Sequence, residues 1–81
     1  VECDFVVQQD EHIEKLIQVC WTLADSKTLQ REIRGLKTAS DLTGCKDCSI
    51  ITFDESDELV SDGIEIKVLP IWKWLLTSPF E

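Results

Sequence analysis

Two short stretches near the start of the chain carry the side chains that could do chemistry. Glu2 and Asp4 alternate along the first stretch, and Gln18 and Cys20 alternate along the second. Metal-dependent phosphodiester hydrolysis uses hard oxygen ligands to hold Mg²⁺ and a cation to stabilise charge on the phosphoryl group. The second stretch offers only a neutral amide, which is a weaker Mg²⁺ ligand, and a thiol, which cannot replace an ammonium group. We therefore expect the remnant of a metal site rather than a working one.

Two strands joined by a short loop would bring these four side chains to one place. Residues 3–8 and 13–22 are rich in β-branched and aromatic side chains, and the polar residues 10–12 separate them, which predicts a β-hairpin. If residues 10–12 form the loop, the antiparallel pairs follow by counting back along the ladder. The expected pairs are Gln9 with Ile13, Val6 with Leu16, Asp4 with Gln18, and Glu2 with Cys20. The four site residues then share one face of the hairpin.

This cluster has three interpretations. It is a polar patch without chemistry, or a surviving weak metal site, or the product of a wrong register. The third arises because a one-residue slip moves every one of these side chains to the opposite face of the hairpin.

The rest of the chain supplies a helix and further strands. Residues 26–43 place apolar side chains at three- and four-residue spacing, which predicts a helix that Asp25 or Ser26 begins and Gly44 ends. Residues 48–53 form a short apolar run typical of a buried strand. The expected elements beyond it are a hairpin with arms 58–61 and 64–68 around Asp62 and Gly63, and a short helix over 71–76 that follows Pro70. We expect an α/β domain with a small mixed sheet and the order ββαββα.

One face of the predicted long helix is basic. Its cations lie roughly opposite the apolar stripe and are Lys27, Arg31, Arg34 and Lys37. A solvated face is one interpretation, and a surface that contacts DNA is the other. The net charge of −8 works against DNA binding, because attraction to phosphate supplies most non-specific affinity for nucleic acid. Nucleic acid is thus an unlikely partner of the whole surface.

Size and composition indicate one soluble domain. The 81 residues are enough for a single domain with a thin core. The longest apolar stretch, residues 68–76, is interrupted by Pro70 and Lys73 and is much shorter than the roughly 20 residues of a membrane span. The four cysteines come without a secretory signal, so we expect reduced thiols and a cytoplasmic location.

Other residues have a functional interpretation beside a simpler one. Cys45 and Cys48 have the spacing of zinc ligands or of a redox pair, but a lone Cys-x-x-Cys is a weak signal and Cys48 suits a small core position. His12 lies among polar loop residues. Trp72 and Trp74 are two residues apart on the predicted short helix, so they cannot both face one core fully, and one of them is a candidate docking anchor for a partner.

The sequence resembles a known family over nearly its whole length. Five segments together look like the C-terminal domain of a group of archaeal and bacterial AAA-type ATPases. They are residues 2–7, 16–21, 25–32, 50–54 and 68–76. The fold of that domain is similar to restriction endonucleases. In members with an intact nuclease-like pattern, Asp4 would be a metal carboxylate, Gln18 would be Glu or Asp, and Cys20 would be Lys. Only the first of these matches, so the motif is degenerate.

The resemblance implies that residues 1–81 are one C-terminal domain of a longer ATPase. The upstream ATPase domain would bind ATP and Mg²⁺, whereas this chain contains no phosphate-binding Gly-x-x-x-x-Gly-Lys-Ser/Thr loop and is expected to need no cofactor. We expect a non-catalytic accessory domain that packs against the ATPase or recognises a protein partner. The alternatives are a metal-dependent DNA nuclease with a displaced active site and a DNA-docking module that uses the basic helix.

Overall fold

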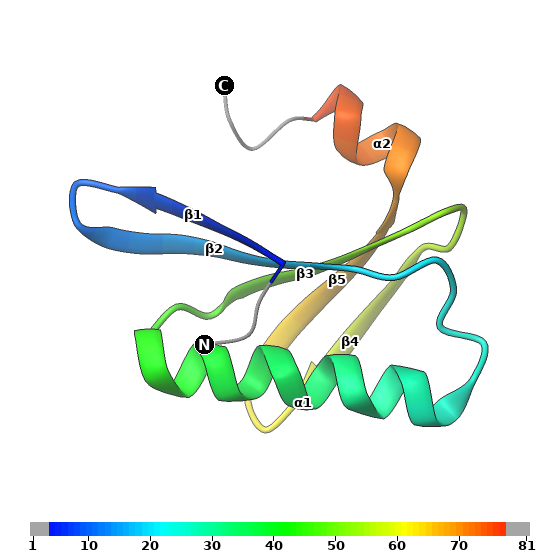
Figure 1. The fold of residues 1–81 in the computed structure, drawn as a ribbon, viewed down its shortest axis with the longest axis horizontal. Helices are drawn as coiled ribbons and strands as arrows, with labels where there is room; N and C mark the ends of the chain where they lie inside the picture. Colours follow the sequence, from blue (N-terminus) through cyan, green and yellow to red (C-terminus); the bar gives the residue numbers. More distant parts are fainter. Residues whose placement is uncertain (1–3, 78–81) are drawn as a thin grey trace.

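The chain forms one sheet and two helices in the computed structural model, which describes residues 4–77 (Figure 1). The elements in chain order are β1 (Phe5–Gln9), β2 (His12–Val19), α1 (Ser26–Thr43), β3 (Asp47–Thr52), β4 (Asp57–Ser61), β5 (Ile64–Pro70) and α2 (Ile71–Leu76). The expected order ββαββα is therefore wrong by one strand, and the observed order is ββαβββα. The three ranges predicted after the long helix, residues 48–53, 58–61 and 64–68, all form strands of the same sheet, so the order ββαββα left one of them out.

The five strands make a small mixed α/β domain, as the sequence predicts. Their spatial order is β1-β2-β3-β5-β4. The three inner strands β2, β3 and β5 are parallel to one another, and β1 and β4 are antiparallel edges. Helix α1 connects the neighbouring parallel strands β2 and β3 and covers one side of the sheet, while α2 follows β5 and lies on the other side (Figure 1).

The first hairpin has the predicted register at its open end but a different turn. Val6 pairs with Leu16 as expected, whereas Gln9 pairs with His12 rather than with Ile13. The turn has two residues, and both Asp10 and Glu11 have positive φ angles (50° and 68°), as turns matching the sheet twist require. An irregularity between Val7 and Gln8 then leaves an extra residue on β2 and restores the register.

Helix α1 begins and ends at the predicted residues. The Asp25 carboxylate accepts a hydrogen bond from the backbone N–H of Lys27 at 2.8 Å, which satisfies one of the free donors of the first turn. Gly44 ends the helix with a φ of 76°, a conformation that costs glycine little.

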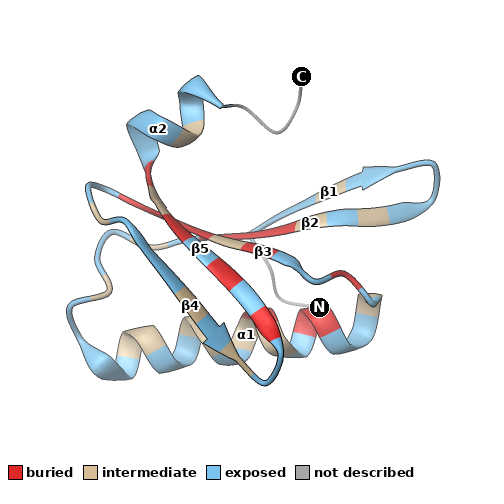
Figure 2. Cartoon of the chain, turned by 180° about the vertical axis from the view of Figure 1, so that it is seen from behind, coloured by how far each residue is buried: buried red, intermediate tan, exposed pale blue. Residues whose placement is uncertain are grey.

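The core lies between α1 and the facing side of the sheet. Its buried residues come from the strands and the helix and are Leu16, Leu36, Ala39, Cys45, Cys48, Ile50, Ile64, Ile66 and Val68. Figure 2 shows these buried positions concentrated along the inner strands and on one side of α1. Because each fully buried Leu or Ile contributes about 1.5–3 kcal/mol, this one layer holds most of the stabilising burial.

The opposite side of the sheet is covered far less. Ile17 and Ile51 are buried there, but large apolar side chains at the ends of the strands and along α2 stay exposed. Within residues 4–77, no helix is long and apolar enough to cross a membrane.

Candidate functional site

Asp4 and Gln18 lie side by side, as the sequence predicts, and hydrogen bonds connect them to each other and to β2. The backbone N–H of Asp4 donates to Gln18 Oε1 at 3.0 Å. The carboxylate Oδ2 of Asp4 accepts from the backbone N–H of Val19 at 2.8 Å. The two contacts extend the pairing of β1 and β2 beyond the last ladder residues. Glu2, the fourth member of the expected site, lies outside the described residues.

Gln18 is buried beneath α1. Gln18 is only 8% exposed. A Cβ atom added to Gly35 would stand 2.9 Å from Gln18 Nε2. Gly35 therefore gives the amide room to lie against the helix backbone. The sequence carries a signal for this contact, because glycine in a helix interior costs about 1 kcal/mol relative to alanine and needs a reason.

Cys20 lies just beyond the end of β2 and is turned toward the following loop. Its Sγ donates to the carbonyl oxygen of Thr22 at 3.2 Å, and its backbone N–H donates to the Ile51 carbonyl at 2.9 Å. The thiol also packs against the edge of the core. Its recorded hydrogen bond is thus made within its own loop.

Glu32 of α1 is a neighbour of this cluster that sequence reasoning missed. Its side chain is 13% exposed, and burial raises the pKa of the Glu32 carboxyl. The Arg31 guanidinium, 4.0 Å away, lowers that pKa, and the charge of Asp4 raises it further. Asp4, which directly precedes β1, thus lies near both Gln18 of β2 and Glu32 of α1. Across residues 4–77, however, no three acidic, His or Cys side chains are grouped so that they could hold a metal ion.

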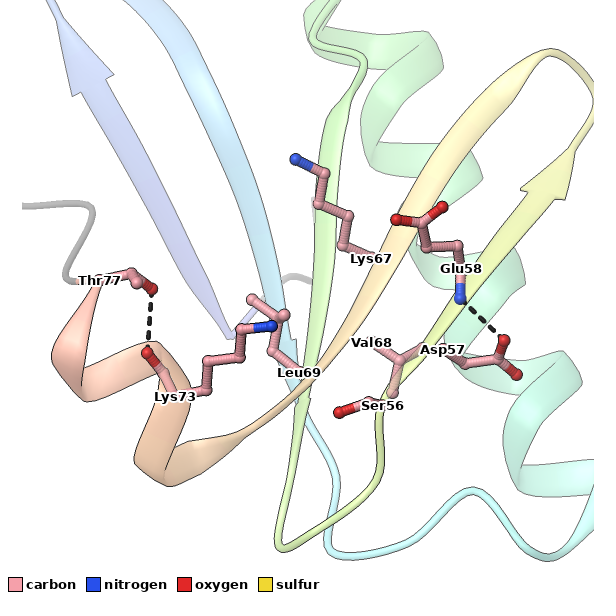
Figure 3. Close-up of a pocket in the computed structure, with 8 residues that line it drawn as sticks. All are labelled: Ser56, Asp57, Glu58, Lys67, Val68, Leu69, Lys73 and Thr77. Atoms are coloured by element: carbon pink, nitrogen blue, oxygen red, sulfur yellow. Dashed lines mark hydrogen bonds between the residues drawn. The ribbon is translucent and has the colours of Figure 1, made fainter.

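A second hairpin carries the acid and lysine that the first one lacks. Glu58 on β4 pairs with Lys67 on β5, and Glu65 precedes Lys67 by two residues on the same exposed face. The two strands and α2 border a groove of about 700 Å³ (Figure 3). The groove is lined by Ser56, Asp57, Glu58, Lys67, Val68, Leu69, Lys73 and Thr77. It therefore presents charges of both signs.

An apolar surface lies where β2 and β3 end. The rings of Trp21 and Phe53 stack with centroids 4.4 Å apart and an angle of 19° between their planes. Backbone hydrogen bonds hold the two segments together, since Phe53 N–H donates to the Trp21 carbonyl at 3.1 Å. Beside the ring pair is a pocket of about 130 Å³, which Ile71 of α2 also lines.

Helix α2 continues this apolar surface. Four exposed apolar side chains lie on one side of the helix, and they belong to Ile71, Trp72, Leu75 and Leu76. Trp74 is half-buried. Of the two tryptophans singled out from the sequence, Trp72 is therefore the one presented to solvent.

The basic side of α1 carries less free charge than the sequence suggests. The ammonium of Lys37 forms an ion pair with Asp62 in the β4–β5 turn, and the Asp62 carboxylate raises the pKa of Lys37. Arg31 is close to Glu32. Lys27 and Arg34 are exposed on the same helix.

The remaining candidates occupy simple structural positions. Cys45 and Cys48 are both buried and belong to the core, so a zinc or redox pair would have to form inside it. His12 is exposed at the start of β2.

No family model, curated protein or solved structure matches this chain. The architecture that the structure itself establishes is a small α/β domain with a five-stranded mixed sheet.

Proposed function

We propose that this chain is a non-catalytic accessory domain that binds another protein through its exposed apolar side. One observation carries the proposal. Large apolar residues from α2 and from the ends of β2 and β3 gather on one surface while the core forms on the other side of the sheet. Large exposed apolar patches on soluble domains mark sites of interaction with proteins, membranes or ligands.

The first hairpin supports the absence of catalysis. The groups that would hold a metal are hydrogen-bonded to β1 and β2, and the position that would need a cation is Cys20. The segment β1-β2-α1-β3 is compatible with the restriction-endonuclease-like fold that the sequence resembles. On that resemblance, a neighbouring AAA-type ATPase domain is the first partner to try.

The proposal is tested with the whole chain and a labelled DNA duplex in MgCl₂ or MnCl₂. We expect no cutting, and Asp4→Ala should leave that result unchanged. Cutting by the purified chain that Asp4→Ala abolishes would show that the first hairpin is an active site, and the proposal would be wrong.

A metal-dependent nuclease with a displaced site is the second candidate, and the β4–β5 hairpin is the observation that favours it. Glu58 and Lys67 lie opposite each other on paired strands at the groove of Figure 3, with Glu65 on the same face. This candidate predicts Mn²⁺ binding at millimolar concentration and DNA cutting that Lys67→Ala removes. Lys46→Ala, a change at an exposed lysine outside the groove lining, is the matched control.

A further inference from the structure

Three segments contribute exposed apolar side chains to the surface at α2 and the strand ends. We call it the α2 surface and define it by Val19, Trp21, Phe53, Ile71, Trp72, Leu75 and Leu76. Ile71 joins the two parts, because it lines the pocket beside Trp21 and Phe53 and begins α2. Trp21 is 71% exposed, Trp72 is 60% exposed and Leu75 is 63% exposed. Such a surface has the aromatic anchors that dominate protein interfaces.

The pocket in the α2 surface suits one inserted side chain. Its volume of about 130 Å³ is close to that of apolar cavities of about 150 Å³ that hold a benzene molecule. Its lining is Val19, Cys20, Trp21, Ile51, Thr52, Phe53 and Ile71, and Thr52 directs its hydroxyl to the carbonyl of Glu55. The pocket therefore takes an apolar anchor rather than a polar group.

A carboxylate lies beside the aromatic end of this surface. Asp54 is exposed and follows Phe53 directly. The Glu55 carboxylate accepts a hydrogen bond from Leu23 N–H at 2.8 Å and lines a pocket with Leu29 of α1, so its charge lies on the core side of the sheet. In α2, Lys73 reaches toward Leu69 in the neighbouring groove (Figure 3). Asp54 thus supplies negative charge at the Trp21 and Phe53 end of the α2 surface.

The free ring face of Trp21 adds a second preference for cations. One face stacks on Phe53, and the 71% exposure of the residue leaves the other face open to solvent. A Lys or Arg side chain over a tryptophan face gains about 0.5–1 kcal/mol at an exposed site. The exposed Asp54 carboxylate, next to Phe53 in the chain, adds to the attraction for the same cation.

We infer that the α2 surface binds a cationic peptide segment of a partner protein, with one apolar residue in the pocket and Lys or Arg residues beside Asp54 and Trp21. The inference rests on the proposed function and specifies the chemistry of the partner. A second copy of this chain is a poorer occupant, because each copy carries a net charge of −8 and the two would repel. A cationic segment lowers that charge on binding.

The test uses three synthetic peptides of equal length, titrated into the whole chain by calorimetry and followed by two-dimensional NMR. The first combines Leu and Lys residues, the second has Glu in place of each Lys, and the third has Ser in place of each Leu. We expect the Leu and Lys peptide to bind at least about tenfold more tightly than either of the others. Its affinity should fall as salt rises, because exposed charges are screened.

Matched variants locate the binding. Trp72→Ser and Asp54→Lys should each weaken the Leu and Lys peptide, Trp72→Ser by at least about tenfold. Leu42→Ser removes a side chain that is equally exposed, at 67%, but lies on α1 across the sheet, and it should leave binding unchanged. Circular dichroism and thermal melting show whether each variant is folded.

Several outcomes would overturn the inference. They are an absence of binding by the Leu and Lys peptide at millimolar concentration, equal binding of the Glu peptide, or equal weakening by Leu42→Ser and Trp72→Ser. A dimer that sedimentation detects and Trp72→Ser dissociates would assign the surface to a second copy. None of these outcomes contradicts the proposal that the chain is non-catalytic. DNA cutting that depends on Asp4 or Lys67 would contradict that proposal, whether or not a peptide binds.

Discussion

Gln18 on β2 and Gly35 on α1 approach each other so closely that a Cβ atom on Gly35 would stand 2.9 Å from Gln18 Nε2. The amide cannot move freely away, because its Oε1 accepts the backbone N–H of Asp4. The contact connects β1, β2 and α1 through one side chain. It gives Gln18 a structural role in the place where the sequence suggested a lost metal ligand.

A double-mutant cycle should detect this contact. Gly35→Ala alone gains about 1 kcal/mol of helix propensity but displaces the Gln18 amide, which loses a hydrogen bond of about the same size, so the unfolding free energy should change little. In a Gln18→Ala background the same change should stabilise the chain by about 1 kcal/mol. Urea unfolding measures both effects, and identical effects of Gly35→Ala in the two backgrounds would contradict the contact.

The Glu32 carboxyl should make the chain less stable as pH rises. Its pKa is raised in the folded chain, mainly by burial, so the folded state holds this proton more tightly than the unfolded state does. Stability is then lost as pH rises from the ordinary value of 4.5 through the raised pKa, and the full penalty is present above that raised pKa.

Glu32→Gln should therefore raise the unfolding free energy at pH 7 and flatten its dependence on pH across that window. Asp41→Asn, at an exposed acid on the same helix, is the control and should leave the pH profile close to that of the original chain. Urea unfolding at a series of pH values provides the measurement. A Glu32→Gln chain that is less stable at pH 7 would show that the carboxylate is stabilising instead.

A carboxylate at position 18 should create a metal site. Gln18→Glu would add a third acid to Asp4 and Glu32, so we expect a less stable chain in EDTA, because three neighbouring carboxylates repel one another. MnCl₂ should restore the stability of this variant, by about 2.7 kcal/mol at a hundredfold excess over the Kd. The original chain and the exposed control Gln9→Glu should show no such shift in melting temperature. Equal Mn²⁺ shifts in all three chains would place any metal elsewhere.

Cys48 should behave as a small apolar core residue. It is 1% exposed, so Cys48→Ala should lower the unfolding free energy by about 1 kcal/mol through the cavity it leaves. Cys20→Ala, at a partly exposed thiol, should cost less.

EDTA should not change the melting temperature of the original chain. A large loss of stability in EDTA would instead indicate that the cysteines hold a structural metal.

Duplex DNA should distinguish the two interpretations of the basic helix. A DNA-docking surface predicts binding at low salt that weakens more with Arg34→Ala than with Lys37→Ala, because Asp62 already pairs with Lys37. A solvated surface predicts no measurable binding, which agrees with the net charge of −8. Fluorescence anisotropy at low and physiological salt separates the two. An effect of Lys37→Ala that equals the effect of Arg34→Ala would contradict the role assigned to Asp62.

Local patterns were enough to locate most elements. The apolar spacing with Asp25 and Gly44 at its ends predicted the bounds of α1, because caps and helix periodicity act over a few neighbouring residues. Asp62 and Gly63 likewise predicted the turn that joins β4 and β5, because a tight turn depends on its own residues. All five strand ranges followed from local patterns, and the order ββαββα was wrong because it left one of them out. The spatial order β1-β2-β3-β5-β4 was not predicted, because pairing in a sheet depends on partners that are distant in the chain.

The amino-acid sequence by itself determined the two strands of the first hairpin, because the alternation of side chains along a strand is a local property, whereas Asp4 meets Gln18 because the irregularity between Val7 and Gln8 restores the register. It also determined a short, largely apolar helix over residues 71–76. Only the tertiary structure decided that Gln18 would lie against Gly35, that Glu32 would come near Asp4, and that Ile71 of α2 would line one pocket with Trp21. Each of these contacts joins elements far apart in the chain, so its existence depends on how the helices pack on the finished sheet.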